Sequence, residues 1–165
     1  MAIVVETGTG ASNSESYISV ADADTRHAAV GNATWASLTT GEKEIALRKA
    51  TRYLVATYRT RWKGERINST QALDWPRYGV QIGPYYLDSN AVPVTVADAC
   101  ADLALKASTE ELAPDLERAV VEEQVGPLRT RYSEFSPQQK RFKAISDALA
   151  PFLTGGAGMV RVCRA

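Results

Sequence analysis

The sequence contains few of the residues on which catalytic and metal sites are usually built. It has one histidine, His27, and two cysteines, Cys100 and Cys163, in 165 residues. A conventional Ser-His-Asp or Cys-His site would need that one histidine, and the cysteines form neither a CxxC motif nor a disulfide framework. The pattern predicts a protein that is not an enzyme and that holds no metal ion and no cofactor.

Two short motifs resemble binding sites without completing one. Asp24 and His27 could share a helix face, but a metal ion there would lack further ligands, so we expect a surface or partly packed histidine. Residues 8–12 are rich in glycine, yet they lack the lysine and the spacing of a phosphate-binding loop. Cys100 falls on the apolar stripe of a predicted helix and is expected in the core.

Long hydrophobic runs and an excess of charge are also missing. No apolar stretch approaches the ~18 residues that a membrane span needs, and residues 1–6 lack the basic flank of a signal peptide. We therefore expect a protein that has no membrane partner and is made in the cytosol. Nineteen basic and nineteen acidic residues give a net charge of zero, which argues against a protein that mainly neutralises nucleic-acid phosphates.

The zero net charge hides a pattern of charged blocks. Residues 42–66 carry eight Lys or Arg and three Glu, whereas residues 88–117 carry seven acids and one Lys. Such blocks suit faces that meet opposite faces, within one fold or between copies. Ordinary solvated helix surface is the alternative, because exposed ion pairs are worth only ~0.2–1 kcal/mol each.

Length and composition predict one domain with a real core. A chain of 165 residues with 45% hydrophobic residues needs no disulfides to fold. Four helix-start signals, three of them capping boxes with an acid, predict helices over about residues 19–30, 40–61, 95–112 and 136–154. Apolar residues at helical spacing then indicate a mainly α-helical bundle. We assign residues 1–153 to a single helical domain and residues 154–165 to a Gly-hinged C-terminal tail.

One β-hairpin is predicted between the third and fourth helices. Residues 120–125 and 128–132 read as strands, and Gly126-Pro127 suits a type II′ turn. An isolated hairpin is marginal in water, so its apolar face must cover either its own helices or a neighbouring subunit. The expected cross-strand pairs are Val121 with Tyr132, Glu122 with Arg131, Glu123 with Thr130, Gln124 with Arg129, and Val125 with Leu128.

Two further regions do not resemble core. Residues 63–94 hold about thirty residues with little regular structure but several aromatic side chains, which indicates an ordered binding loop or an Ω-type loop packed by its own side chains. Residues 154–165 begin with a Gly-rich hinge and continue with alternating apolar and basic residues. This pattern is typical of a strand that pairs beyond its own domain; a frayed terminus is the alternative.

One cluster could bind nucleic acid. Residues 59–66 place four basic residues around Trp62, and cations beside a stacking aromatic ring suit single strands. The cluster also lies at a helix C-terminus, where cations favour the helix dipole. Trp62 follows Tyr58 by four residues, so it could simply cap the core, and we favour this structural role.

Several stretches of the sequence resemble one family encoded beside the capsid genes of tailed bacteriophages. Its members are often labelled DnaT-like single-stranded-DNA-binding proteins, and their gene position and helical fold resemble head–tail adaptor (head completion) proteins. The likeness covers nearly the whole chain. The stretches that carry it are residues 14–19, 61–64, 71–79 with the Leu-Asp-Trp-Pro-Arg motif, 125–128, and 155–162.

The resemblance implies a structural virion protein without chemistry of its own. A small helical bundle with a hairpin would repeat as a homo-oligomeric ring, usually twelvefold, under the portal protein. The ring would extend the DNA channel, let double-stranded DNA pass without specific binding, and dock a head-closure (stopper) or tail-terminator protein. The expected location is the neck of the virion, after assembly in the host cytoplasm.

The expected contact residues of this adaptor lie in the loop, the hairpin and the tail. Trp75 and Arg77 are expected to support assembly more than folding. The predicted subunit interface comprises Trp62, Trp75, Arg77, Tyr78, Tyr85, Tyr86, Val125, Leu128, Arg129 and Arg131. The predicted portal or neighbour contact comprises Met159, Val160, Arg161, Val162 and Arg164. The alternative function is a single-stranded-DNA-binding accessory protein of phage replication.

Overall fold

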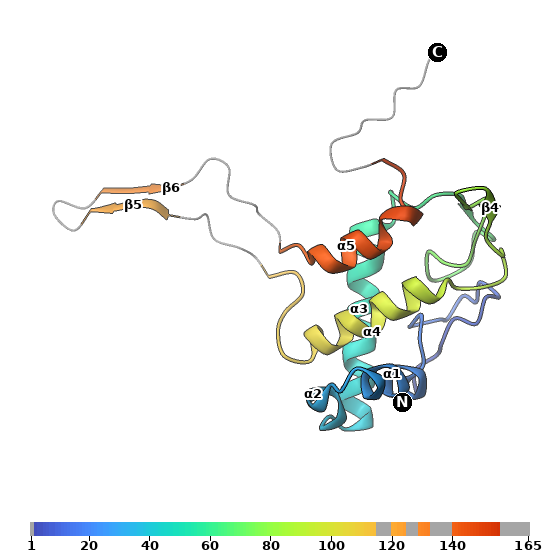
Figure 1. The fold of residues 1–165 in the computed structure, drawn as a ribbon, viewed down its shortest axis with the longest axis horizontal. Coiled ribbons are helices and arrows are strands. Elements are labelled where there is room, and N and C mark those ends of the chain that lie inside the picture. The colour runs from blue at the N-terminus through green and yellow to red at the C-terminus, as the bar shows by residue number, and fades with distance from the viewer. Residues whose placement is uncertain (1, 115–119, 125–128, 133–139, 156–165) are drawn as a thin grey trace, which may run out of the picture.

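The computed structural model describes residues 2–114, 120–124, 129–132 and 140–155. These residues form a mainly α-helical body and three two-stranded sheets, which confirms the predicted fold class (Figure 1). No helix among them has the length and apolarity to cross a membrane. The helices are α1 (Val20–Ala29), α2 (Ala33–Ala36), α3 (Thr40–Tyr58), α4 (Val94–Ala107), α5 (Lys143–Leu149) and the 3-10 turn η1 (Ala150–Phe152). The strands are β1 (Glu65–Arg66), β2 (Arg77–Tyr78), β3 (Gln81–Ile82), β4 (Tyr85–Tyr86), β5 (Val120–Gln124) and β6 (Arg129–Tyr132).

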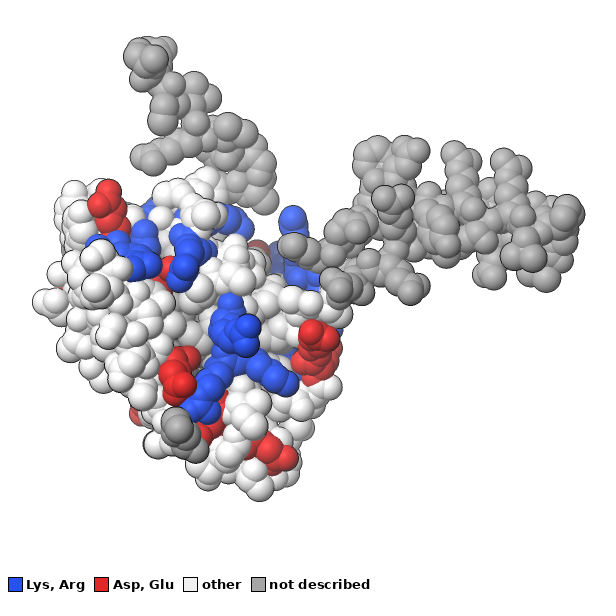
Figure 2. Space-filling view, turned by 180° about the vertical axis from the view of Figure 1, so that it is seen from behind, with Lys and Arg blue, Asp and Glu red and all other residues white. Residues whose placement is uncertain are grey.

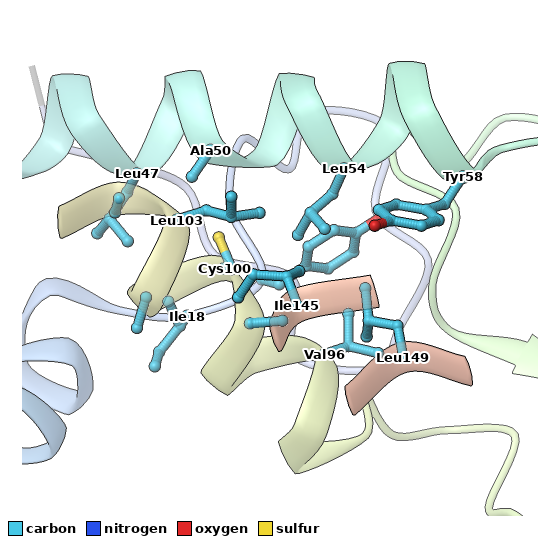
Figure 3. Packing of buried hydrophobic residues seen from close by; sticks show 14 of the residues in the cluster. Ile18, Leu47, Ala50, Leu54, Tyr58, Val96, Cys100, Leu103, Ile145 and Leu149 are labelled. Atoms are coloured by element: carbon cyan, nitrogen blue, oxygen red, sulfur yellow. The ribbon is translucent and has the colours of Figure 1, made fainter. Parts of the chain in front are cut away.

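The core lies between α3 and the helices that pack across it. Helix α4 packs on α3 and on α1, and α5 packs on α4. Figure 3 shows side chains of α3 pointing toward those of α4 and α5. The predicted apolar stripes are therefore the buried ones, and Cys100 lies among them with no exposed surface. The central buried residues are Leu47, Ala50, Leu54, Tyr58, Val96, Cys100, Leu103, Ile145 and Leu149.

Two of the predicted helix-start signals are confirmed and one is wrong. The hydroxyl of Ser19 accepts a hydrogen bond from the Asp22 backbone N–H at the start of α1. Thr39 and Glu42 form a complete capping box at the start of α3. By contrast, α4 begins after Pro93 without any side-chain cap. The carboxylate of Asp98, which was expected to cap α4, instead forms an ion pair with Arg26 of α1 at 2.8 Å.

Several helix boundaries differ from those predicted. The short helix α2 was not anticipated, and α3 ends at Tyr58 rather than at residue 61. The last helix starts at Lys143 and not at residue 136, and residues 140–142 before it are not helical. The predicted cap at residues 136–139 lies outside the described residues.

The C-terminal end of the described body is joined to the segment after α3. The backbone N–H of Lys63 donates to the carbonyl of Phe152 at 2.9 Å, and that of Thr154 donates to the carbonyl of Arg61 at 2.6 Å. An antiparallel bridge between Trp62 and Leu153 lies between these bonds. The predicted tail beyond residue 155 lies outside the described residues, so the proposed division at residue 154 stays a prediction.

The predicted hairpin is present, with one change of register. Strands β5 and β6 pair antiparallel, and Glu122, Glu123 and Gln124 face the partners that the sequence predicted. The expected pair of Val121 with Tyr132 is wrong, because a bulge between residues 120 and 122 brings Val120 opposite Tyr132. The predicted pair at the turn lies outside the described residues. The two strands form a sheet of their own, and Figure 1 shows them to one side of the helical body.

Candidate functional site

The long loop between α3 and α4 is held by one buried guanidinium. Arg77 Nε donates to the carbonyl of Lys63 at 2.8 Å, and Nη2 donates to the carbonyl of Gly64 at 2.6 Å. Its Nη1 donates to the carbonyl of Asp74 at 3.2 Å. The side chain is buried, and this burial lowers the pKa of the guanidinium. Arg77 therefore links the start of the loop, at residues 63 and 64, to its middle, at residue 74.

Two tryptophans pack under this loop. Trp75 is fully buried and makes edge-on contacts with the rings of Trp62 and Phe152, at centroid distances of 5.5 and 5.9 Å. Trp62 also contacts the ring of Tyr58 at 5.7 Å. The prediction that Trp62 caps the core is confirmed.

These positions change the role of three predicted interface residues. The side chains of Trp62, Trp75 and Arg77 are buried within the single protomer, so they hold the loop together. The expectation that Trp75 and Arg77 serve assembly more than folding is therefore corrected. This part of the loop matches the Ω-type alternative, in which a loop is packed by its own side chains. Leu73 and Val80, on either side of Trp75, are buried in the same hydrophobic core cluster as Trp75.

A buried carboxylate links the loop to the helices. Asp74 has no exposed side-chain surface, and its Oδ1 accepts a hydrogen bond from Arg59 Nε at 3.0 Å. Its backbone N–H donates to the Tyr17 hydroxyl at 3.0 Å. Burial, followed by the nearby Asp74 charge, raises the pKa of Tyr17 above its usual range. This cluster fixes the loop against α3 and the segment that precedes α1.

The other end of the loop presents three exposed tyrosines, which we call the tyrosine ribbon: Tyr78, Tyr85 and Tyr86. Their exposed fractions are 49%, 75% and 72%. Strand β3 pairs with β4, so that Gln81 lies opposite Tyr86. Lys63 Nζ donates to the Gln81 carbonyl at 3.4 Å, which brings a cation to this ribbon. All three predicted tyrosines are therefore available for a contact outside the protomer.

A groove with two differently charged walls lies at the foot of the hairpin. It has a volume of about 1110 Å³ and runs between α3 and the segment that follows α4. On the α3 wall, Lys49 and Arg52 are exposed and make no ion pair with another described residue. Figure 2 views the molecule from the side on which α3 is exposed, and Lys and Arg side chains gather in the middle of that face. Sequence reasoning missed this groove, because only folding brings its two walls together.

The opposite wall of the groove is acidic. Glu110 and Glu111 are both exposed there, and Lys140 forms an ion pair with Glu110 at 2.5 Å. This pairing lowers the pKa of Glu110. Tyr53 and Ala56 of α3 and Leu112 of the opposite segment also line the groove. The groove thus has basic and less polar residues on α3, and acidic and apolar residues on the segment that follows α4.

The few residues with catalytic or metal-binding potential are placed in the core. His27 is buried, its Nε2 donates to the carbonyl of Ala101 at 3.1 Å, and its Nδ1 accepts from Asn32 at 2.9 Å. The expectation of a surface or partly packed histidine is therefore wrong. Burial raises the pKa of Cys100. No group of three metal-ligating side chains occurs among the described residues.

The remaining predicted contact residues are described only in part. Arg129 and Arg131 lie on β6, opposite Gln124 and Glu122 of β5. Val125 and Leu128 of the turn lie outside the described residues. So does the whole predicted tail contact, which comprises Met159, Val160, Arg161, Val162 and Arg164. Their roles stay predictions.

The comparison with known proteins identifies one family. The whole chain, residues 1–165, matches the family described as "Putative DnaT-like ssDNA binding protein". Neither a curated protein nor a solved structure matches the chain.

Proposed function

The chain belongs to the DnaT-like family, and we propose that this member is a structural protein, the head–tail adaptor of a tailed-bacteriophage particle. As such it forms a homo-oligomeric ring of about twelve copies under the portal protein. The ring extends the DNA channel and docks the head-closure or tail-terminator protein that follows. The likeness of its sequence motifs to adaptor-like proteins supports this role, and the following surfaces support it further.

One observation carries the proposal. The β5–β6 hairpin forms a sheet separate from the other strands, and Figure 1 shows it beside the helical body rather than in it. An isolated two-stranded hairpin is marginally stable in water, and stability requires packing against a further element. In an assembly, the neighbouring copy supplies that element. A ring subunit needs such a head-to-tail contact between two different faces.

The charge of the chain suits a DNA channel. Its net charge is zero, so its electrostatic attraction for phosphates is weak compared with that of a dedicated DNA-binding protein. Weak attraction lets duplex DNA slide during packaging and ejection. We propose that the tail, residues 159–164, reaches the portal or an adjacent copy by strand addition.

Co-sedimentation with portal rings tests the adaptor role. The full chain should sediment with the rings, and a variant without residues 157–165 should not, although its thermal unfolding should stay nearly unchanged. A chain that never sediments with portal rings would contradict the proposal. Continued joining by the truncated variant would contradict only the role of the tail.

A second function, single-stranded-DNA binding, is favoured by the description of the family and by the tyrosine ribbon. Tyr85 and Tyr86 offer exposed rings for base stacking, and Lys63 adds a cation beside them. Fluorescence anisotropy with a labelled single-stranded oligonucleotide, measured over a range of salt concentrations, tests it. Tight binding that weakens with salt and is lost in a Y85A/Y86A variant would favour this function; no binding would exclude it.

A further inference from the structure

We propose that the β5–β6 hairpin of one copy occupies the groove at the foot of the hairpin of the next copy. The acidic strand β5 lies along the basic wall on α3, and the basic strand β6 lies along the acidic wall. The inference rests on the proposed adaptor function and names the surfaces by which its ring subunits meet.

The charges of the groove are separated by wall. Lys49 and Arg52 belong to α3 and are exposed without an ion pair in the described part of the chain. Glu110 and Glu111 follow α4 on the opposite side. Because Lys140 already pairs with Glu110, Glu111 is the acid that remains open to a partner. A partner must therefore carry acids on one edge and bases on the other.

The hairpin has this distribution of charge. Strand β5 carries Glu122 and Glu123, and strand β6 carries Arg129 and Arg131. Paired strands run about 4.8 Å apart, so the acidic residues lie along one strand of the ribbon and the basic residues along the other. The register places Glu122 opposite Arg131 across the ribbon. Placing β5 along the basic wall and β6 along the acidic wall brings opposite charges together, whereas the exchanged placement brings like charges together.

The apolar parts of the two surfaces also correspond. Tyr53, Ala56 and Leu112 line the groove beside the charged residues of its two walls. The hairpin contains Val120, Val121 and Tyr132 in addition to its charged residues. Burying apolar surface between two partners favours their association. The groove thus offers the apolar support that an isolated hairpin lacks.

The connections of the hairpin suit a contact between copies. Its two connecting segments leave the body at Pro114 and Lys140, which themselves line the groove. In Figure 1 the hairpin lies to one side of the helical body. A hairpin in a neighbour's groove makes a heterologous contact, and such contacts form a ring when the rotation between successive copies closes.

Cysteine cross-linking between two full-length variants tests this contact. One copy carries A56C in the groove and the other carries Q124C in the hairpin, both with C163S to remove a competing thiol. The mixture should form a cross-linked product much faster than a control mixture in which K143C on α5 replaces A56C, because Lys143 is exposed but does not line the groove. No product at millimolar protein, or a rate equal to that of the control, would overturn the proposal.

Charge reversal then tests the orientation. Adding K49E and R52E to the groove variant should slow the cross-linking at least about tenfold, because like charges would meet β5. Adding E122K and E123K to the hairpin variant should restore the rate to within about threefold. Circular dichroism of each variant checks its fold. An unchanged rate with the groove reversal, or no recovery with both reversals, would contradict the proposed orientation.

Two other outcomes identify a different use of these surfaces. A single chain that carries both A56C and Q124C, and cross-links within itself at high dilution, would show that the hairpin occupies its own groove. Loss of oligonucleotide binding in the K49E/R52E variant without any effect on cross-linking would assign the groove to nucleic acid. Either result overturns the inference, whereas co-sedimentation with portal rings tests the adaptor role independently.

Discussion

The carboxylate of Glu6 is held by the backbone of Gly10. Glu6 Oε1 accepts hydrogen bonds from the N–H groups of Gly8 and Gly10, both at 2.9 Å, and Oε2 accepts from the Ala11 N–H and the Ser14 hydroxyl at the same distance. Gly8 and Gly10 have positive φ angles of 103° and 65°, which side chains with a Cβ rarely adopt. The N–H groups of the Gly-rich loop therefore bind the carboxylate of Glu6 rather than a phosphate. This agrees with the absence from the loop of the lysine that a phosphate-binding loop carries.

The Glu6 loop yields the first prediction. Replacing Glu6 with Gln puts an amide NH₂ against backbone N–H donors and should lower the free energy of unfolding by ~1–3 kcal/mol. Ser14→Ala removes a single hydrogen bond to the carboxylate and should cost less. Urea denaturation of both variants measures the difference. Equal stability of E6Q and the parent chain would show that the carboxylate is not needed to hold the loop.

The burial of Trp75 leads to the second prediction. Trp75→Ala should cost ~3–5 kcal/mol, because it leaves a cavity between Trp62 and Phe152. Tyr85→Ala on the tyrosine ribbon serves as the control and should change stability by less than ~0.5 kcal/mol. Thermal unfolding followed by circular dichroism compares the two. A folded W75A protein with an unchanged melting temperature would support the original expectation that Trp75 serves the subunit interface more than folding.

Two threonines at helix starts provide a matched pair for the third prediction. Thr39 caps α3, whereas Thr95 lies just inside α4, whose start has no side-chain cap. Thr39→Ala should therefore destabilise the protein by ~1 kcal/mol, and Thr95→Ala should do so by less than half as much. Denaturant titrations give both values. A larger effect at Thr95 would restore the capping box that the sequence predicted for α4.

The fourth prediction concerns pH and His27, the single histidine of the chain. Burial lowers its pKa, while Asp24, Asp102 and Arg26 supply the nearby charges. An unfolded histidine titrates near about pH 6.5, so below that value the unfolded state binds more protons than the folded state. The stability from the neutral ring is thus present above about pH 6.5 and falls as the pH drops below it.

A neutral substitution at His27 checks this assignment. The free energy of unfolding, measured in urea between pH 5.5 and pH 7.5, should rise with pH in the parent chain. His27→Gln cannot take up the proton, so its stability should depend less on pH, even though the variant is less stable overall. The same slope in both proteins would place the pH dependence elsewhere.

The sequence predicted the helical core well because periodicity reports burial directly. Leu47, Leu54 and Tyr58 recur at helical spacing, and all three are buried in α3. The cap of α4 failed for a tertiary reason: Asp98 has a stronger partner in Arg26, which also binds Asp102 in a bidentate manner. Local sequence cannot reveal a partner that lies on another helix.

The functional surfaces were harder to predict. Trp75 and Tyr85 are both aromatic residues of one long loop, yet the first is fully buried and the second is 75% exposed. Pattern alone cannot separate them, because the loop has no period from which to read a face. The groove was equally hidden, since Arg52 and Glu111 are distant in sequence and become its two walls only when α3 and α4 pack.

Electron microscopy of portal rings incubated with this protein tests the adaptor role most directly. Portal rings incubated with the full chain should gain a second ring of density, built from about twelve copies whose hairpins each reach the next copy. The same protein should bind single-stranded oligonucleotides only weakly. Bare portal rings, together with tight, salt-sensitive oligonucleotide binding through the tyrosine ribbon, would contradict the account and establish the second function instead.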